Sequence, residues 1–244
     1  MNWRSECGVV IPCLNEAATI AELVAKVRAH FSTVLVVDDG STDATSAQAR
    51  SAGALVLRHP QPAGKGMALN AGLAWLHERQ FSWALLMDGD GQHCPEDIPA
   101  FLREADSAPA AMVIGNRMGQ ASRMPWLRRR VNRWMSRRLS RLSGRSLPDS
   151  QCGFRLVQLA SWAPLNIQAA HFEIESEMLI AFLAAGLEVR FVPIQVVYGR
   201  ERSKVRPGLD SWRWCCWWWR RRRAGRSRPG LLRTGRLPGL NSVS

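Results

Sequence analysis

The chain has 244 residues and a formal net charge of +13, with 33 lysines and arginines against 20 acidic residues. This length suits one domain with a sizeable core, and the charge indicates an anionic partner such as nucleic acid, anionic lipid or a phosphorylated substrate. Two acid-free segments, residues 107–148 and 211–244, contain ten and nine of the arginines. No uncharged apolar run approaches the roughly 20 residues of a membrane span, so we expect no segment that crosses a bilayer.

The six cysteines show neither the spacing of a disulfide framework nor the paired spacing of a zinc site. The first residues lack the charged and apolar regions of a signal peptide. We therefore expect reduced thiols and a cytoplasmic location.

Apolar β-branched runs alternate with helical patterns along the first half of the chain. Such alternation predicts right-handed βαβ units, and hence an α/β fold with a Rossmann-like, mostly parallel sheet flanked by helices. Asn15 is expected to cap the helix that follows the first strand. The expected strands are residues 7–12, 33–37, 54–57, 84–87 and 112–115, followed by late strands at 188–193 and 196–198.

Two of the predicted strands end in paired aspartates. Asp38 and Asp39 follow the second strand, and Asp88 and Asp90 follow the fourth. Open α/β sheets bind ligands at the carboxyl ends of their strands, and ionised aspartates are seldom grouped without a compensating cation or donors. Two hard oxygen donors one residue apart suit Mg²⁺ or Mn²⁺. The alternative is an acidic turn with a helix cap, which would account for Asp43 and one hydroxyl group.

A Pro/Gly loop ends in Gly64-Lys65-Gly66 at the start of a predicted helix. Its backbone donors and its one cation suit a neighbouring phosphate group. The spacing of a Walker loop is absent, so the segment does not predict a P-loop nucleotide site. Further along, Arg155 is either an active-site group or the partner of an acid.

Eight short motifs follow one another along the chain: VIPCLNE (10–16), VVDDGSTD (36–43), GKG (64–66), MDGDGQH (87–93), IGNR (114–117), DSQCGFR (149–155), VPI (192–194) and RSK (202–204). In order and spacing they resemble the motifs of the family 2 glycosyltransferases, and most closely the branch of dolichyl-phosphate mannosyltransferase and its bacterial polyprenyl-phosphate relatives. The resemblance covers about residues 7–210 and implies a GT-A fold and transfer of a sugar, with inversion, from a nucleotide-diphosphate sugar.

The resemblance also implies roles for individual residues. Asp38 resembles the residue that holds the base and ribose of the donor. Asp88 and Asp90 resemble the acids that hold the donor diphosphate and a divalent metal, Mg²⁺ or Mn²⁺, with Gln92 as a further metal ligand. The donor-binding set expected from the motifs is Pro12, Asn15, Glu16, Asp38, Asp39, Lys65 and Asp88.

The acceptor decides whether the reaction needs a base. A polyprenyl phosphate presents an oxygen that is already anionic, which Arg117, Arg202 and Lys204 could position. A hydroxyl acceptor requires a general base, for which Asp149, Glu173 and Glu175 are the candidates. The expected catalytic set is Asp90, Asp149, Arg117, Arg202 and Lys204.

A basic amphipathic insertion is expected at about residues 117–145. A Trp/Leu face beside an Arg face, without acids, is typical of a helix lying in a membrane interface. The alternatives are a solvated basic helix that packs its apolar stripe on the domain, and a nucleic-acid-binding helix. The stripe consists of Trp126, Leu127, Val131, Trp134, Met135, Leu139 and Leu142.

Residues 211–244 form a tail that is rich in Trp and Arg and has no core-forming period. The tail is either an interfacial anchor, because Trp and Arg favour the headgroup region, or unselected sequence from a shifted reading frame. We expect the tail to be disordered, and residues beyond about 220 to be poorly ordered. The expected organisation is therefore one GT-A domain over residues 1–210 and a tail over 211–244.

These features predict an inverting, metal-dependent hexosyltransferase, peripherally associated with the inner face of the cell membrane. Its expected partners are a nucleotide-sugar donor and a lipid-linked acceptor, a polyprenyl phosphate. One alternative is a glycosyltransferase that acts on a hydroxyl group of a glycan or glycolipid. A second alternative is a basic nucleic-acid-binding protein, but the acidic sheet edge and the confinement of most arginines to two segments argue against nucleic acid as a partner.

Overall fold

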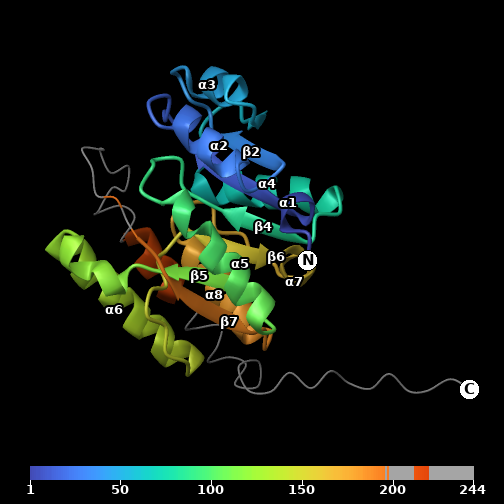
Figure 1. Cartoon of the computed structure of the whole chain (residues 1–244). Helices are drawn as coiled ribbons and strands as arrows, with labels where there is room; N and C mark the ends of the chain where they lie inside the picture. Colours follow the sequence, from blue (N-terminus) through green and yellow to red (C-terminus); the bar gives the residue numbers. More distant parts are fainter. Residues whose placement is uncertain (196, 198–211, 220–244) are drawn as a thin grey trace, which may run out of the picture.

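The computed structural model describes residues 1–195, 197 and 212–219, with the side chains of residues 121–123 left out. One seven-stranded sheet in the order β3-β2-β1-β4-β6-β5-β7 runs through the molecule (Figure 1). Only β6 is antiparallel to its neighbours, so the predicted α/β class with a mostly parallel sheet is confirmed. The strands are β1 (Cys7–Cys13), β2 (Thr33–Asp38), β3 (Leu55–Arg58), β4 (Trp83–Leu86), β5 (Met112–Asn116), β6 (Arg155–Gln158) and β7 (Val189–Pro193).

Helices connect the strands and cover the sheet (Figure 1). In α2 the residues Ile20, Leu23, Val24 and Val27 are buried, which is the spacing of one helical face turned toward a core. Helix α4 lies against β1 and β2. The helices are α1 (Trp3–Glu6), α2 (Ile20–Arg28), α3 (Thr45–Ser51), α4 (Lys65–Glu78), α5 (Ile98–Ser107), α6 (Trp126–Ser143), α7 (Leu159–Trp162) and α8 (Ile174–Ala184), with 3-10 turns η1 (Pro95–Asp97) and η2 (Met118–Arg123).

The strand order determines where a ligand can bind. From β1 the chain proceeds outward to β2 and β3, and then returns to place β4 on the other side of β1. This reversal makes the junction of β1 and β4 a topological switch point, outside which open α/β sheets form a crevice. Because β6 runs antiparallel to β4, with Leu86 opposite Arg155, the loop that precedes β6 reaches the same edge of the sheet.

Asn15 does not cap α2, so that prediction is wrong. Helix α2 begins at Ile20, and Asn15 lies outside it with a positive φ of 53°. Its backbone N–H donates to Ser41 Oγ, and its Oδ1 accepts the N–H of Thr42, each at 2.8 Å. Asn15 therefore ties the loop after β1 to the loop after β2. Of the late strand expected at 196–198, only residue 197 lies among the described residues.

The predicted basic helix is present as α6 and lies on the outside of the molecule, beside α8 (Figure 1). Its apolar stripe is divided between the core and solvent. Met135 and Leu139 are buried in the core, whereas Trp126 and Leu127 are 64% and 55% exposed. No described helix is both long and apolar enough to cross a membrane.

The expected disorder of the tail is wrong for residues 212–219, which form a helix. The reason is that its tryptophans have apolar partners: Trp214 is only 2% exposed, with its ring centroid 5.3 Å from that of Trp134 on α6. The indole Nε1–H of Trp214 donates to Ser176 Oγ on α8 at 2.8 Å. The rest of the tail, residues 211 and 220–244, lies outside the described residues.

Candidate active site

The two predicted acid pairs lie at the carboxyl edge of the sheet, next to the switch point. Asp38 is the last residue of β2, and Asp88 follows the end of β4 by two residues. The loop before β6 brings Gly153 to the same place, where an added Cβ would lie 2.9 Å from Asp88 Oδ2. A side chain larger than hydrogen at Gly153 would therefore displace the Asp88 carboxylate.

Lys65 joins the second acid pair to α8. Its Nζ lies 2.6 Å from Asp88 Oδ1 and 2.6 Å from Glu175 Oε1. Burial alone would lower the pKa of Lys65, but the two carboxylates outweigh burial and raise it. Burial likewise acts to raise the pKa of Asp88, yet Lys65 and His93 hold it well below its usual range. The lysine is therefore protonated and Asp88 ionised at neutral pH.

The backbone around Lys65 is engaged within the protein, contrary to the expectation that its amides serve a phosphate. Gly64 N–H donates to Asp39 Oδ2 at 2.8 Å, and Gly66 N–H donates to Ala170 O at 2.8 Å. Gly64 has a φ of 107°, and a Cβ there would lie 2.3 Å from Ala170 O. The glycines allow this close approach, and the Lys65 side chain is the group of the segment that reaches the acid pair.

The first acid pair is held by its own loops. Asp38 is fully buried and accepts the N–H of Ser41 at 2.8 Å and the hydroxyl of Ser46. Burial acts to raise the pKa of Asp38, but these two serines outweigh it and lower the pKa. Asp39 accepts the N–H groups of Ala63 and Gly64. Both carboxylates thus shape the loop 39–44 with the first turn of α3, and the loop 59–64, which frame this side of the site.

The loop after β1 completes the same side. Pro12 lies within β1 opposite Val37 of β2. The backbone N–H of Glu16 donates to Thr45 Oγ1 at 2.8 Å, as Asn15 does to Ser41. The VIPCLNE and VVDDGSTD motifs therefore meet in space through hydrogen bonds between their loops.

Asp90 and Gln92 lie together in the turn after β4. Asp90 Oδ1 accepts the N–H of Gln92 at 3.0 Å, and Gln92 Oε1 accepts Arg128 Nη1 from α6 at 3.3 Å. His93, to which the sequence analysis assigned no role, is buried, and its Nδ1 accepts the N–H of Asp88 at 3.1 Å. Its ring stacks on Phe154 with centroids 5.1 Å apart, so His93 fixes the backbone that carries the acids.

Arg117 and Asp149 form a buried bidentate ion pair. Arg117 Nε donates to Asp149 Oδ2 at 2.7 Å and Nη2 donates to Oδ1 at 2.8 Å, and the backbone N–H of Arg117 adds a third bond. Burial acts to raise the pKa of Asp149, but the guanidinium outweighs burial and lowers it. A carboxylate so engaged is a poor proton acceptor at neutral pH. Arg117 is close enough to Asp88 to help lower the pKa of that carboxyl as well.

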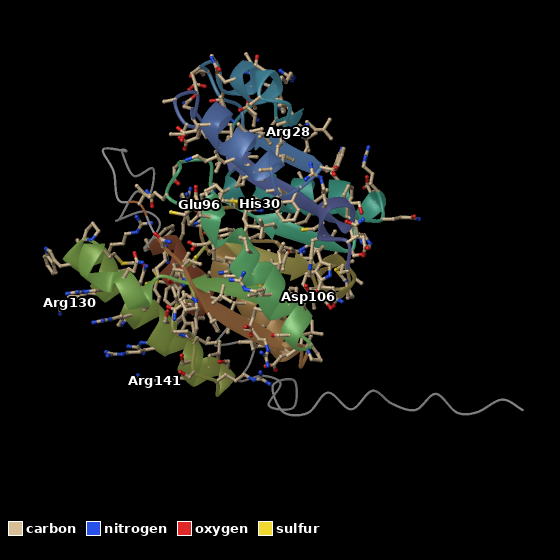
Figure 2. The ribbon with its side chains drawn as sticks, viewed as in Figure 1. Arg28, His30, Glu96, Asp106, Arg130 and Arg141 are labelled. Atoms are coloured by element: carbon tan, nitrogen blue, oxygen red, sulfur yellow. The ribbon has the colours of Figure 1, made fainter. Side chains whose placement is uncertain are left out.

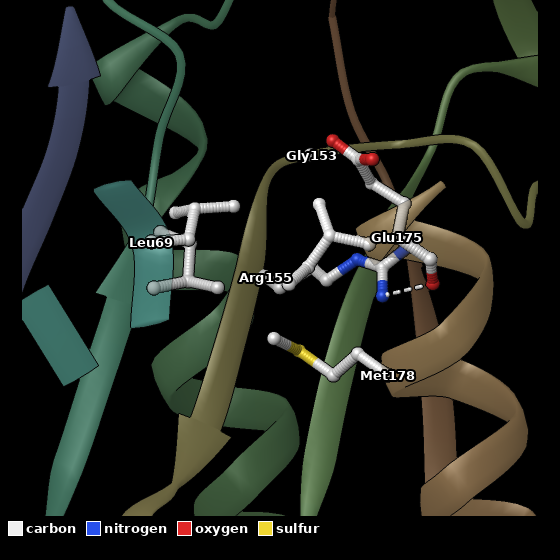
Figure 3. Close-up of a pocket in the computed structure, with 7 residues that line it drawn as sticks. Leu69, Gly153, Arg155, Glu175 and Met178 are labelled. Carbon is white, nitrogen blue, oxygen red and sulfur yellow. Dashed lines mark hydrogen bonds between the residues drawn. The ribbon is translucent and has the colours of Figure 1, made fainter. Parts of the chain in front are cut away.

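Arg155 is fully buried and binds main-chain oxygens, rather than serving as the partner of an acid. It donates to Ser150 O, Cys152 O and Glu175 O at 2.7–3.0 Å. Figure 3 shows the bond to Glu175 O. These bonds fasten the loop before β6 to the first turn of α8. The cavity beside Arg155, of about 10 Å³, holds no more than about one water molecule, so it is not a ligand pocket.

The other predicted residues divide between α8 and the undescribed part of the chain. Glu173 is half-buried at the N-cap position of α8, and Glu177 Oε2 accepts the N–H groups of Gln168 and Ala169. Glu177 is therefore a structural acid. Arg202 and Lys204 lie outside the described residues.

The acid pair after β4 fits a divalent cation. Among the described residues, no three His, Cys, Asp or Glu side chains converge as a complete metal site. Mg²⁺ and Mn²⁺ do not require one, since they commonly bind one or two protein carboxylates and take their other ligands from water and substrate phosphates. Asp88 and Asp90 supply hard oxygen donors at the open sheet edge, and Gln92 supplies an amide oxygen.

Comparison with known proteins gives a consistent result. The family model described as glycosyl transferase family 2 matches residues 8–161. UDP-N-acetylglucosamine–dolichyl-phosphate N-acetylglucosaminyltransferase of Methanococcus voltae is 28% identical over 213 residues, 78% of this chain and 85% of that protein. Polyprenol monophosphomannose synthase of Mycolicibacterium smegmatis is 33% identical over 172 residues, 66% of this chain and 64% of that protein.

The fold also matches a solved structure. Glucosyl-3-phosphoglycerate synthase from Mycobacterium tuberculosis, in complex with Mn²⁺, UDP-glucose and phosphoglyceric acid, aligns with a TM-score of 0.68. The two chains are 24% identical, and the alignment covers 86% of this chain and 77% of the other. This likeness confirms the expected GT-A fold.

Proposed function

The chain belongs to glycosyl transferase family 2, and we propose that it transfers a hexose, with inversion, from a nucleotide-diphosphate sugar to a polyprenyl phosphate at a membrane surface. One observation carries the proposal. At the switch point of the sheet, the ionised Asp88 lies beside the protonated Lys65, and two of the three candidate bases, Asp149 and Glu175, are paired with cations. Such a site suits an anionic acceptor that needs no deprotonation.

The donor would lie across the carboxyl ends of β1, β2 and β4. Asp88 and Asp90, with Gln92, would hold Mg²⁺ or Mn²⁺, which stabilises the charge that develops on the leaving nucleotide diphosphate. The loops shaped by Asp38 and Asp39, together with the loop of Pro12, Asn15 and Glu16, would form the side that receives the nucleoside. Lys65 would face the diphosphate.

The acceptor phosphate would approach from the side of Arg117, with Arg202 and Lys204 as further ligands. In this arrangement Asp149 orients Arg117, because a bidentate carboxylate fixes the plane of the guanidinium. The names of two relatives support a lipid phosphate acceptor, since one refers to dolichyl phosphate and the other to a polyprenol.

A thermal-shift panel of UDP, GDP and their sugar derivatives with Mn²⁺ tests the donor. A ligand at a hundred times its Kd stabilises the native state by about 2.7 kcal/mol. For a chain of this size that corresponds to a rise in Tm of roughly 5–10 °C. We expect such a rise for one nucleotide class, and its loss in EDTA. If no nucleotide diphosphate raises Tm, the proposed activity is wrong.

The surface of α6 supports membrane docking. Met135 and Leu139 anchor the helix to the core, so the exposed Trp126 and Leu127 are presented on a firmly held element. Arg130 and Arg141 project from the outer side of the same helix (Figure 2). Exposed apolar side chains next to arginines match the interface of an anionic bilayer, where each arginine contributes about 1 kcal/mol.

The double change Trp126→Ser with Leu127→Ser is expected to weaken binding to anionic vesicles at high salt by tenfold or more. Salt screens the arginine contribution, and burying one large apolar side chain accounts for about 1.5–3 kcal/mol. Co-sedimentation of the full chain with vesicles over a salt series measures this. Leu55→Ser, at a 49% exposed position on the edge strand β3, is the matched control. A wild-type chain that stays in the supernatant at low salt contradicts membrane docking.

A further inference from the structure

The Lys65 ammonium has two carboxylate partners, and only one of them belongs to the proposed metal site. Asp88, on the loop after β4, is the proposed metal ligand, and Glu175 comes from the first turn of α8. A divalent cation placed at Asp88 would compete with Lys65 for the same carboxylate and would repel the ammonium. Lys65 therefore requires a second anion if it is to stay in the site when metal binds.

Glu175 is suited to be that anion. Its side chain is 6% exposed, and its carboxylate points toward the loop at Gly153, away from Met178 (Figure 3). The main-chain oxygen of Glu175 accepts Arg155 Nη1 at 2.7 Å, so the first turn of α8 is held firmly. Among the described residues, Glu175 Oε2 is buried without a hydrogen-bond partner, which leaves it able to accept a second ammonium proton.

The surroundings confine Lys65 to this place. A Cβ at Gly153 would lie 3.1 Å from Lys65 Nζ, so the backbone passes directly beside the ammonium. The ring centroid of Phe172 lies 5.6 Å from Nζ. Small shifts of the ammonium between Asp88, Glu175 and a bound anion are therefore its available movements.

We propose that Glu175 is a positioning residue, which retains Lys65 in the site when Asp88 turns to the metal and so makes the ammonium a ligand of the donor diphosphate. Glu175 is then not a general base. The inference rests on the proposed function, and it adds a residue that acts through Lys65 rather than on the sugar. Lys65 then competes with the metal for the Asp88 carboxylate before the donor binds. Once metal and donor are bound, Lys65 is a ligand of the diphosphate.

The test is a double-mutant cycle read by binding, with Mn²⁺ alone and Mn²⁺ with pyrophosphate as probes. Electron paramagnetic resonance of free Mn²⁺ and calorimetry give the two affinities. Glu175→Gln should weaken binding of the Mn²⁺–pyrophosphate pair about ten- to a hundredfold, the range for a hydrogen bond to a charged group. Lys65→Met should weaken binding of the Mn²⁺–pyrophosphate pair by a similar factor. The same change should strengthen binding of Mn²⁺ without pyrophosphate, because the ammonium no longer competes for Asp88. In the Lys65→Met background, Glu175→Gln should cause no further loss.

Glu177→Gln is the matched control, because it makes the same change two residues along α8 at an acid that caps Gln168 and Ala169. It should lower Tm and leave pyrophosphate binding unchanged. Glu175→Asp keeps the charge but shortens the reach to Lys65, so it should also weaken pyrophosphate binding. This variant serves as the test if the Glu175→Gln chain does not fold.

If the wild type binds the Mn²⁺–pyrophosphate pair, two results would overturn this inference but not the proposed function. One is unchanged pyrophosphate binding in a folded Glu175→Gln chain. The other is a double variant in which the losses of pyrophosphate affinity from the two single changes add up. A wild type that binds neither pyrophosphate nor any nucleotide diphosphate with Mn²⁺ overturns the proposed function as well.

Discussion

Asp90→Asn is expected to reduce metal-supported sugar transfer by roughly a hundredfold or more while leaving the fold intact. The loss is of the size seen when one group that stabilises developing charge is removed. The fold should survive because Asp90 is half-buried and its Oδ1 accepts the N–H of Gln92, which an asparagine oxygen can also do. Steady-state turnover against Mn²⁺ concentration, with Tm measured in parallel, checks both parts.

The matched control is Asp106→Asn, the same change at an exposed aspartate on α5 that accepts Trp3 Nε1. This control should keep its turnover. Full activity in Asp90→Asn, or in the wild type after treatment with EDTA, would show that the acid pair does not hold a catalytic metal.

The second large effect is on stability. Asp149→Asn is expected to lower the free energy of unfolding by about 3–5 kcal/mol, because it leaves the buried Arg117 guanidinium without its counter-charge. Urea unfolding at pH 7 measures the loss. Adding Arg117→Met should restore part of the lost free energy of unfolding, because the double variant no longer buries an unpaired guanidinium. The exposed pair Arg145–Glu188 is the control, where Glu188→Gln should change stability by about 0–1 kcal/mol.

The same ion pair predicts a pH dependence. The pKa of Asp149 is lowered in the folded chain, so its contribution to stability is fully present above the unfolded pKa, near 4, and is lost as pH falls through the folded pKa. The wild type should therefore lose this contribution below about pH 4. Asp149→Asn should lack that component, so the stability difference between the two chains should narrow in acid. An equal difference at pH 7 and pH 3 would contradict the assignment.

The parts of the fold that the sequence predicted are those with local signals. β1 and β4 are apolar runs buried on both faces of a parallel sheet, and glycine or proline marks their ends. The acids that follow such strands lie at one edge because parallel strands share their direction. That reasoning located Asp38 and Asp88 correctly at the carboxyl edge of the sheet.

Pairings between distant segments have no local signal. The contact between Lys65 and Glu175 spans 110 positions and depends on the antiparallel insertion of β6, which the alternation of strands and helices does not reveal. Asn15 follows an apolar strand and precedes a helix, which is the pattern of an N-cap. In the structure, however, its backbone N–H donates to the hydroxyl of Ser41 in the loop after β2. In the tail, the burial of Trp214 depends on its contacts with α6 and α8, which the local pattern of apolar residues around it does not reveal.

The packing of Trp214 also bears on synthesis. On the ribosome, α6 and α8 emerge well before residues 212–219, and chains fold progressively from the N-terminus as they emerge. During that interval the surface around Trp134 and Ser176 that Trp214 will cover is open to solvent. Closure of this surface is thus a late event of biosynthesis, and the nascent chain carries an uncovered apolar patch until then.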